Sequence, residues 1–120
     1  MRFLIVDDEP DLRLILQVNL RRWGHDTVLA ATTAEAYDRI VERAPDAMLL
    51  DVSMPEETGL ELLARLQADD LVPPQVALLS AMLPAALAQQ AGTSGVRHLS
   101  KPFCLTELET LVGEMAAAAL

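Results

Sequence analysis

Four short strand-like runs, rich in apolar residues, recur along this chain, and each leads directly to a polar residue. The runs and the residues that follow them are Phe3–Val6 with Asp7 and Asp8, Ala47–Leu50 with Asp51, Val76–Leu79 with Ser80, and Val96–Ser100 with Lys101. Parallel strands that are buried on both faces read as short continuous apolar runs. Because ligands of open α/β sheets bind beyond the carboxyl ends of such strands, we expect these polar residues to converge on one crevice.

Helical patterns alternate with these runs and with a further strand expected near residues 27–30. The helices are expected near residues 10–23, 32–43, 59–68, 84–91 and 105–119. Strict alternation of strand and helix predicts a parallel sheet with helices on both faces and right-handed crossovers. The sequence therefore predicts an α/β, doubly wound, flavodoxin-like fold, with a five-stranded parallel sheet of order 2-1-3-4-5 flanked by five helices.

The first two helices carry boundary and packing signals. Pro10 lies near the first turn of one helix and Gly24 follows its end, as is usual at helix boundaries. Helical spacing predicts an apolar face in this helix, made of Leu12, Ile15, Leu16 and Leu20. Thr32 with Glu35 predicts a capping box at the start of the second helix. The second helix is expected to bury Ala36, Ile40 and Val41.

The bulk properties of the chain restrict its class and its partners. Its 120 residues fit one domain spanning 1–120, with an aliphatic core, because 52% of the residues are hydrophobic and only 3% are aromatic. A net charge of -9 argues against direct contact with nucleic acid, which requires a basic face. No apolar run approaches the roughly 18 residues of a membrane span. The one cysteine, Cys104, fits a reducing cytoplasm and is expected to be buried.

The polar residues at the strand ends suit a divalent cation and a phosphoryl group. Asp7, Asp8 and Asp51 would crowd negative charge, which raises the pKa of carboxyl groups unless a cation offsets it. Mg²⁺, or Mn²⁺ in its place, binds through carboxylate and other oxygen ligands. Lys101, the only lysine among nine cationic residues, adds a second positive charge. The alternative to a shared metal site is that Asp7 and Asp8 cap the first helix, but this alternative leaves Asp51 without a role.

Four segments of the sequence together resemble a known family. They are Phe3–Pro10 (FLIVDDEP), Leu49–Pro55 (LLDVSMP) with Gly59, Leu79–Ala81 (LSA) and Leu99–Phe103 (LSKPF). In their order and spacing they resemble the receiver domains of two-component response regulators, the CheY-like superfamily. The resemblance implies a phosphorelay signal transduction switch that carries an aspartyl phosphate. Such a switch assists its own phosphorylation and dephosphorylation rather than acting as a separate enzyme.

The resemblance assigns roles to the acidic residues. It implies that Asp51 is the phosphoacceptor, which takes a phosphoryl group from the phosphohistidine of a histidine kinase. It also implies that Asp8, Asp51 and the backbone carbonyl of Ser53 bind Mg²⁺ directly, and that Asp7 acts through water.

The resemblance further implies that Lys101 holds a phosphoryl oxygen, and that the hydroxyl of Ser80 turns toward the phosphoryl group to switch the domain. The family usually has Tyr or Phe on the strand before the lysine, where this chain has His98. The first interpretation is that His98 substitutes as a flat, half-buried ring. The second is that its protonation makes the switch respond to pH, because imidazole titrates near neutrality.

The resemblance also implies partners. A sensor histidine kinase or a phosphotransfer protein would supply the phosphoryl group, and an output domain or effector protein would read the switch, with a phosphorylation-dependent homodimer as one form of output. Two rival functions are a Mg²⁺-dependent phosphatase of the haloacid-dehalogenase type and a degenerate receiver used only for docking. The phosphatase needs a second Asp where this chain has Ser53, and a degenerate receiver would have lost site residues that are intact here.

Overall fold

The structure is a computed structural model, and it describes residues 1–81 and 96–119. The strands are β1 (Arg2–Val6), β2 (Asp26–Ala30), β3 (Ala47–Asp51), β4 (Gln75–Ser80) and β5 (Arg97–Ser100). The helices are α1 (Pro10–Arg22), α2 (Thr33–Glu42), α3 (Gly59–Ala68) and α5 (Leu105–Ala118). These bounds lie within one or two residues of those expected from the sequence. The helix expected near residues 84–91 lies outside the described residues.

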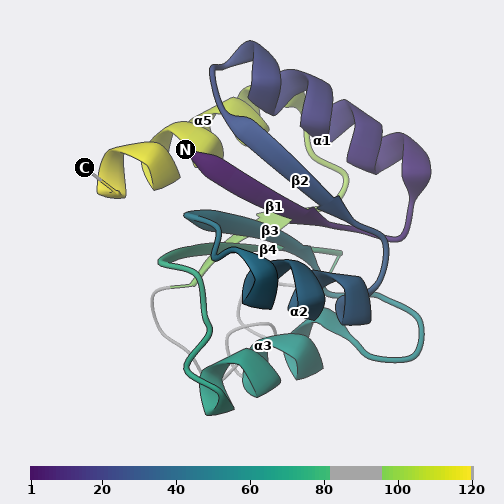
Figure 1. Ribbon diagram of the computed structural model, residues 1–120. Helices are drawn as coiled ribbons and strands as arrows, with labels where there is room; N and C mark the ends of the chain where they lie inside the picture. The colour runs from purple at the N-terminus through teal and green to yellow at the C-terminus, as the bar shows by residue number, and fades with distance from the viewer. Residues whose placement is uncertain (82–95, 120) are drawn as a thin grey trace.

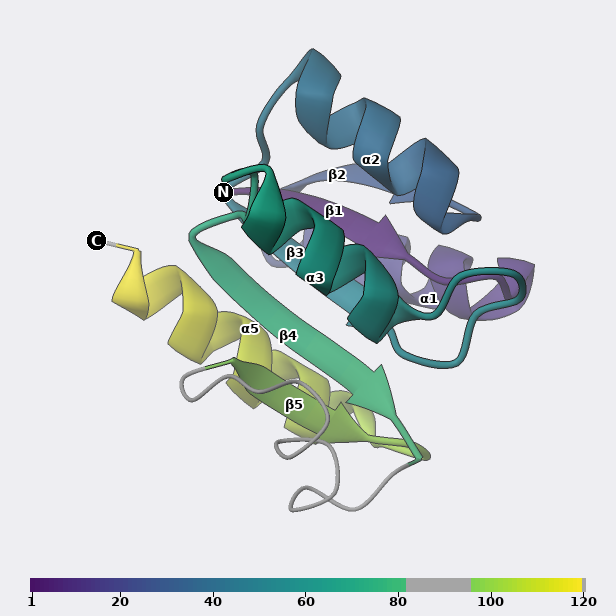
Figure 2. The same ribbon diagram turned by 90° about the horizontal axis from the view of Figure 1, so that it is seen from below.

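The strands form one five-stranded sheet in the order β2-β1-β3-β4-β5, and every neighbouring pair is parallel. The predicted α/β doubly wound fold and its strand order are therefore confirmed. Helices α1 and α5 cover one face of the sheet, and α2 and α3 cover the other (Figure 1). Figure 2 shows the face covered by α2 and α3. Because β1 and β3 are neighbours, their carboxyl ends lie side by side.

Side chains of the strands alternate between two aliphatic cores, one beneath each helical layer. The core beneath α2 and α3 includes Leu4, Val6, Met48, Leu50, Leu62 and Leu66. The core beneath α1 and α5 includes Phe3, Ile5, Leu16, Leu20, Leu49 and Leu108. Burial on both faces explains why β1 and β3 read as unbroken apolar runs.

One face of α1 carries apolar side chains that the fold does not cover. The prediction that Ile15 belongs to the buried face is wrong, because its side chain is 50% exposed. Leu16 and Leu20, one helical turn apart, define the buried line, and Ile15 is rotated about 100° from Leu16 around the helix axis. With Leu14 and Val18, which are 56% and 54% exposed, Ile15 forms the α1 apolar patch.

The second helix departs from expectation in a similar way. Ala36 and Ile40 are buried as predicted, but Val41 is 60% exposed because it lies one residue beyond the buried line. At the start of α2 the Glu35 N–H donates to Oγ1 of Thr32 at 3.1 Å, which is half of the predicted capping box. None of the helices within residues 1–81 and 96–119 is long and apolar enough to cross a membrane.

Candidate functional site

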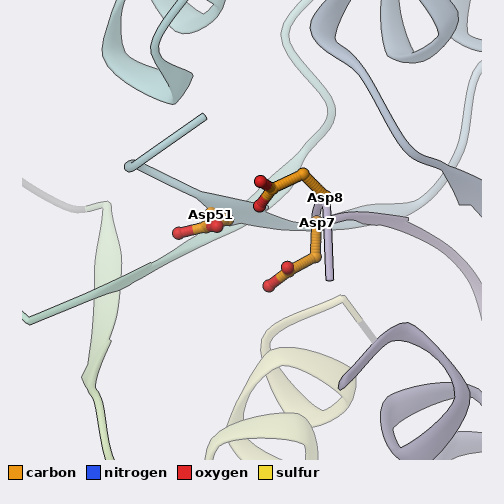
Figure 3. Close-up of side chains that lie close together, drawn as sticks. All are labelled: Asp7, Asp8 and Asp51. Atoms are coloured by element: carbon orange, nitrogen blue, oxygen red, sulfur yellow. The ribbon is translucent and has the colours of Figure 1, made fainter. Parts of the chain in front are cut away.

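Three carboxylates gather where β1 and β3 end. Asp51 is the last residue of β3, and Asp7 and Asp8 follow directly after β1. Each carboxylate offers one oxygen, and these oxygens lie within 4.8 Å of one another (Figure 3). Asp7 and Asp51 are buried, with 0% and 2% of their surfaces exposed, whereas Asp8 is exposed. The structure thus brings together three residues that are distant in the sequence, because their strands are neighbours.

The first turn of α1 holds Asp7 in place. Its Oδ1 accepts a hydrogen bond from the Glu9 N–H at 2.9 Å, and its carbonyl oxygen accepts one from Nη1 of Arg13 at 2.7 Å. Glu9 is the N-cap residue of α1. Helix capping therefore accounts for one oxygen of Asp7 and not for Asp8. No sequence pattern distinguishes Arg13, because an arginine near the start of an amphipathic helix is unremarkable.

The Lys101 ammonium group lies between two of the carboxylates. Its Nζ is 3.3 Å from Oδ2 of Asp7 and 3.4 Å from Oδ1 of Asp51. Lys101 follows β5, where its N–H donates to the carbonyl oxygen of Ser80 at 2.8 Å, and its peptide bond to Pro102 is cis. Burial disfavours the charged ammonium, but the carboxylates of Asp51 and Asp7 outweigh burial and raise the pKa of Lys101. The side chain is therefore a cation at neutral pH.

The Asp51 carboxyl group holds its proton more tightly than an ordinary aspartate. Burial, followed by the charge of Asp7, raises its pKa from 3.8 to about 6, although Lys101 and the Ser53 N–H oppose the rise. The Ser53 N–H donates to Oδ1 at 3.2 Å, the oxygen that Lys101 also contacts. Within residues 1–81 and 96–119, Oδ2 accepts no hydrogen bond. A carboxylate with one unengaged oxygen is suited to attack an electrophile or to bind a cation.

The start of α3 packs directly against the backbone of Asp51. A Cβ built on Gly59 would meet the carbonyl oxygen of Asp51 at less than 3.0 Å, a separation that real Cβ atoms essentially never show. The Gly59 N–H donates to the carbonyl oxygen of Val52 at 2.9 Å. Thr58 and Glu61 cap the helix reciprocally, each bond being 3.2 Å long. Gly59 therefore sets how closely α3 approaches Asp51, a contact that the sequence motif does not reveal.

The two serines expected at the site, Ser80 and Ser53, differ in burial. Ser80 ends β4, the strand between β3 and β5, and only 4% of its surface is exposed. Its position lies between the strand ends that carry Asp51 and Lys101. Ser53 is exposed and follows Asp51 by two residues, so that its backbone reaches the carboxylate.

Two side chains near the last strand are more exposed than expected. The interpretation of His98 as a half-buried ring is wrong, because its side chain is exposed. β5 is an edge strand, and alternation directs Leu99 into the core and His98 to the opposite face. Cys104, expected to be buried, is exposed because it is the N-cap residue of α5. Its N–H donates to Oε1 of Glu107 at 3.1 Å, which lowers the pKa of Glu107.

The donor set is suited to a hard divalent cation. Three carboxylates and one ammonium group leave negative charge uncompensated at the strand ends. Clustered carboxylate oxygens are ligands that Mg²⁺ and Mn²⁺ accept. The exposed Asp8 is the carboxylate that such an ion could reach first from solvent, and the buried Asp51 lies beside it.

Comparison with known proteins agrees with this geometry. A family model for the response regulator receiver domain matches residues 3–113. The phosphate regulon transcriptional regulatory protein PhoB of Pseudomonas aeruginosa is 36% identical over 110 residues, covering 88% of this chain and 47% of PhoB. Sporulation initiation phosphotransferase F of Bacillus subtilis is 30% identical over 113 residues, covering 92% of this chain and 90% of that protein.

Solved structures show the same fold. The receiver domain of the Francisella response regulator 1452 superposes with a TM-score of 0.88 at 26% identity, covering 99% of this chain and 98% of that one. The response regulator TrrA of Thermotoga maritima, in complex with Mg²⁺ and BeF, superposes with a TM-score of 0.81 at 26% identity, covering 95% and 97%.

The fold and the acidic site define a doubly wound α/β signalling domain. The chain belongs to the response regulator receiver domain family and is a receiver domain of the two-component type. The family resemblance inferred from the sequence is therefore confirmed. The chain spans about half the length of PhoB, at 47%, but 90% of phosphotransferase F.

Proposed function

We propose that Asp51 accepts a phosphoryl group and that its phosphorylation switches the conformation of this domain. The observation that carries the proposal is the environment of Asp51, a nearly buried carboxylate that contacts Lys101 and has neighbouring carboxylates within 4.8 Å. With a pKa of about 6, most of Asp51 is ionised at pH 7.5 and is therefore nucleophilic.

The donor in this proposal is the phosphohistidine of a sensor histidine kinase or a phosphotransfer protein in the cytoplasm. An oxygen of Asp51 attacks phosphorus, and the phosphorus–nitrogen bond breaks. The imidazole nitrogen keeps the electron pair, and the product is an acyl phosphate. Phosphoryl transfer needs positioning and stabilisation of charge on the phosphoryl oxygens more than it needs further covalent chemistry. Lys101, already 3.4 Å from Asp51, is placed to hold one of those oxygens.

A divalent cation, Mg²⁺ or Mn²⁺, would complete the site. Asp8, Asp51 and the backbone carbonyl of Ser53 would bind it directly, and Asp7 would act through water. Support comes from the carboxylate oxygens within 4.8 Å of one another and from the Mg²⁺ present with the related TrrA. When bound, the cation offsets negative charge on the phosphoryl oxygens.

Ser80 and His98 are the proposed route by which the signal leaves the site. The carbonyl oxygen of Ser80 accepts a hydrogen bond from the N–H of Lys101, the residue that follows β5. The Ser80 hydroxyl, on turning toward a phosphoryl group, would therefore act beside β5, the strand that carries His98. Because His98 is exposed, we expect it to contact whatever reads the switch, an output domain, an effector protein or a second copy of this domain.

The α1 apolar patch is a suitable docking surface for the histidine kinase. Leu14, Ile15 and Val18 are each at least half exposed, and α1 begins two residues after Asp8. A partner helix seated on the patch would lie beside the carboxylates, where a phosphohistidine must arrive. Exposed apolar patches that border polar groups commonly mark protein interaction sites.

Incubation with acetyl phosphate and Mg²⁺ tests the phosphoacceptor. The native chain should gain one phosphate by mass spectrometry, and Asp51→Asn should gain none. Asp38→Asn, which changes an exposed aspartate on α2, is the matched control and should behave like the native chain. Continuous release of inorganic phosphate with turnover would instead indicate a phosphatase. Absence of any labelling would indicate a docking module.

Substitution within the patch tests the partner separately. Ile15→Gln should slow phosphotransfer from a histidine kinase by about tenfold, the effect of losing about 1.4 kcal/mol of apolar contact. It should leave labelling by acetyl phosphate unchanged. Val41→Gln, at an aliphatic site on α2 that is 60% exposed, should affect neither reaction. An equal loss of phosphotransfer rate in both variants would show that the α1 apolar patch is not the docking surface.

A further inference from the structure

A second pocket lies away from the acidic site, between the end of α2 and the β2 edge of the sheet. Its volume is about 560 Å³, and it is lined by Arg2, Val28, Leu29, Arg39, Glu42 and Arg43. Figure 2 shows α2 lying over β2 and β1. Arg2 begins β1 whereas Asp7 follows its end, so five residues of extended strand, roughly 16 Å, separate their backbones.

The charge of this pocket is opposite to that of the molecule. The chain has 18 acidic and nine basic residues, yet the residues that line this pocket include three of the nine basic ones and one acidic residue, Glu42. All charged residues of the chain lie within the described residues, because residues 82–95 contain none. Asp46 also lies nearby, where its Oδ2 accepts a hydrogen bond from the Arg2 N–H at 2.8 Å, so the three arginines still outnumber the carboxylates of Glu42 and Asp46.

Most of the hydrogen-bond donors in the pocket are not used by the protein. A guanidinium group carries five N–H donors. Arg2 donates through Nη1 to the carbonyl oxygen of Arg43 at 2.9 Å, and Arg39 donates through Nη1 to Oε2 of Glu42 at 3.3 Å. The Arg43 side chain makes no hydrogen bond or ion pair within residues 1–81 and 96–119. The remaining donors are available to a ligand.

The lining selects the class of ligand. Guanidinium forks match the oxygens of phosphate in bidentate geometry, and a phosphate monoester carries about -1.5 to -2 charge, enough to engage more than one arginine. Val28, half-buried on the face of the sheet that α2 covers, adds an apolar wall. A water molecule occupies about 30 Å³ in the liquid, so the pocket has room for far more than a phosphate ion. We infer that this pocket binds a small organic phosphate, with its phosphate against the arginines and its apolar body against Val28.

Phenyl phosphate, inorganic phosphate and phenol are the probes that test this inference. Each is titrated into the ¹⁵N-labelled protein without Mg²⁺, and the amide shifts of Val28 and Leu29 are followed by NMR. Phenyl phosphate should shift both amides with a Kd below about 1 mM. Inorganic phosphate should bind at least about fivefold more weakly, because it lacks the apolar body, and phenol should not bind. Equal binding of phenyl phosphate and inorganic phosphate would overturn the assignment to an organic ligand.

Arginine variants test the location. Arg39→Gln and Arg43→Gln should each weaken phenyl phosphate binding by about tenfold, because each removes charge-assisted hydrogen bonds. Arg22→Gln removes the same charge from the exposed end of α1 and should leave the affinity unchanged. Asp51→Asn should also leave it unchanged, which separates this pocket from the proposed phosphoacceptor. An equal loss in Arg22→Gln would show diffuse attraction of anions and overturn the inference.

Discussion

Asp51→Asn should stabilise the protein in the absence of metal, even though it removes the proposed phosphoacceptor. Asp51 has a pKa of about 6 in the folded chain, compared with 3.8 for an ordinary aspartate. Because folding raises the pKa, the protonated form favours the folded state. This contribution is fully present below about pH 4 and is lost as the pH rises from about 4 through 6. Above pH 6, the buried carboxylate costs about 3 kcal/mol of folding free energy, which asparagine does not incur.

The expected gain in unfolding free energy depends on pH in a defined way. Asp51→Asn should gain about 3 kcal/mol at pH 7.5 and about 1 kcal/mol at pH 4.5. Urea denaturation in EDTA, followed by the fluorescence of Trp23, the only tryptophan, measures both values. Asp38→Asn, at an exposed site, is the control and should show no such pH dependence. A gain that is equal at the two pH values, or a loss at pH 7.5, would refute the assignment of the cost to buried ionisation.

Three further predictions concern neighbouring residues. Gly59→Ala should destabilise the fold by about 1–3 kcal/mol in urea denaturation, because the new Cβ collides with the Asp51 backbone. Gly113→Ala, at a helical glycine with open space around it, should instead stabilise by about 1 kcal/mol, and a gain in both would contradict the packing explanation. Lys101→Met should raise the pKa of Asp51 above 6 in a carboxyl ¹³C NMR titration, because it removes the nearest cation, and an unchanged pKa would contradict the role of the ion pair. Mg²⁺ at one hundred times its Kd should stabilise the native chain by about 2.7 kcal/mol in thermal or urea unfolding, and Asp8→Asn should lose most of this gain. An undiminished gain in Asp8→Asn would show that Asp8 is not a ligand of the ion.

Local patterns in the sequence were sufficient to predict the fold and the convergence of the acidic residues. Buried parallel strands require short apolar runs, and the carboxyl ends of such strands meet at one edge of the sheet. Asp7, Asp8 and Asp51 directly follow such runs, so their meeting depends only on strand order. Lys101 reaches the same edge from β5 by the same rule.

Properties that depend on contacts between distant segments could be known only from the tertiary structure. Ile15 is exposed because it lies on a face of α1 that the fold leaves uncovered, and His98 is exposed because β5 is an edge strand. The spacing of residues in the sequence does not encode either property. The contact of Gly59 with Asp51 and the raised pKa of Asp51 both arise from burial that is summed over several elements. The sequence thus determines which chemical groups stand at the ends of the strands. Only packing decides how strongly those groups hold their protons and which surfaces remain for partners, because exposure and electrostatics are sums over the whole fold.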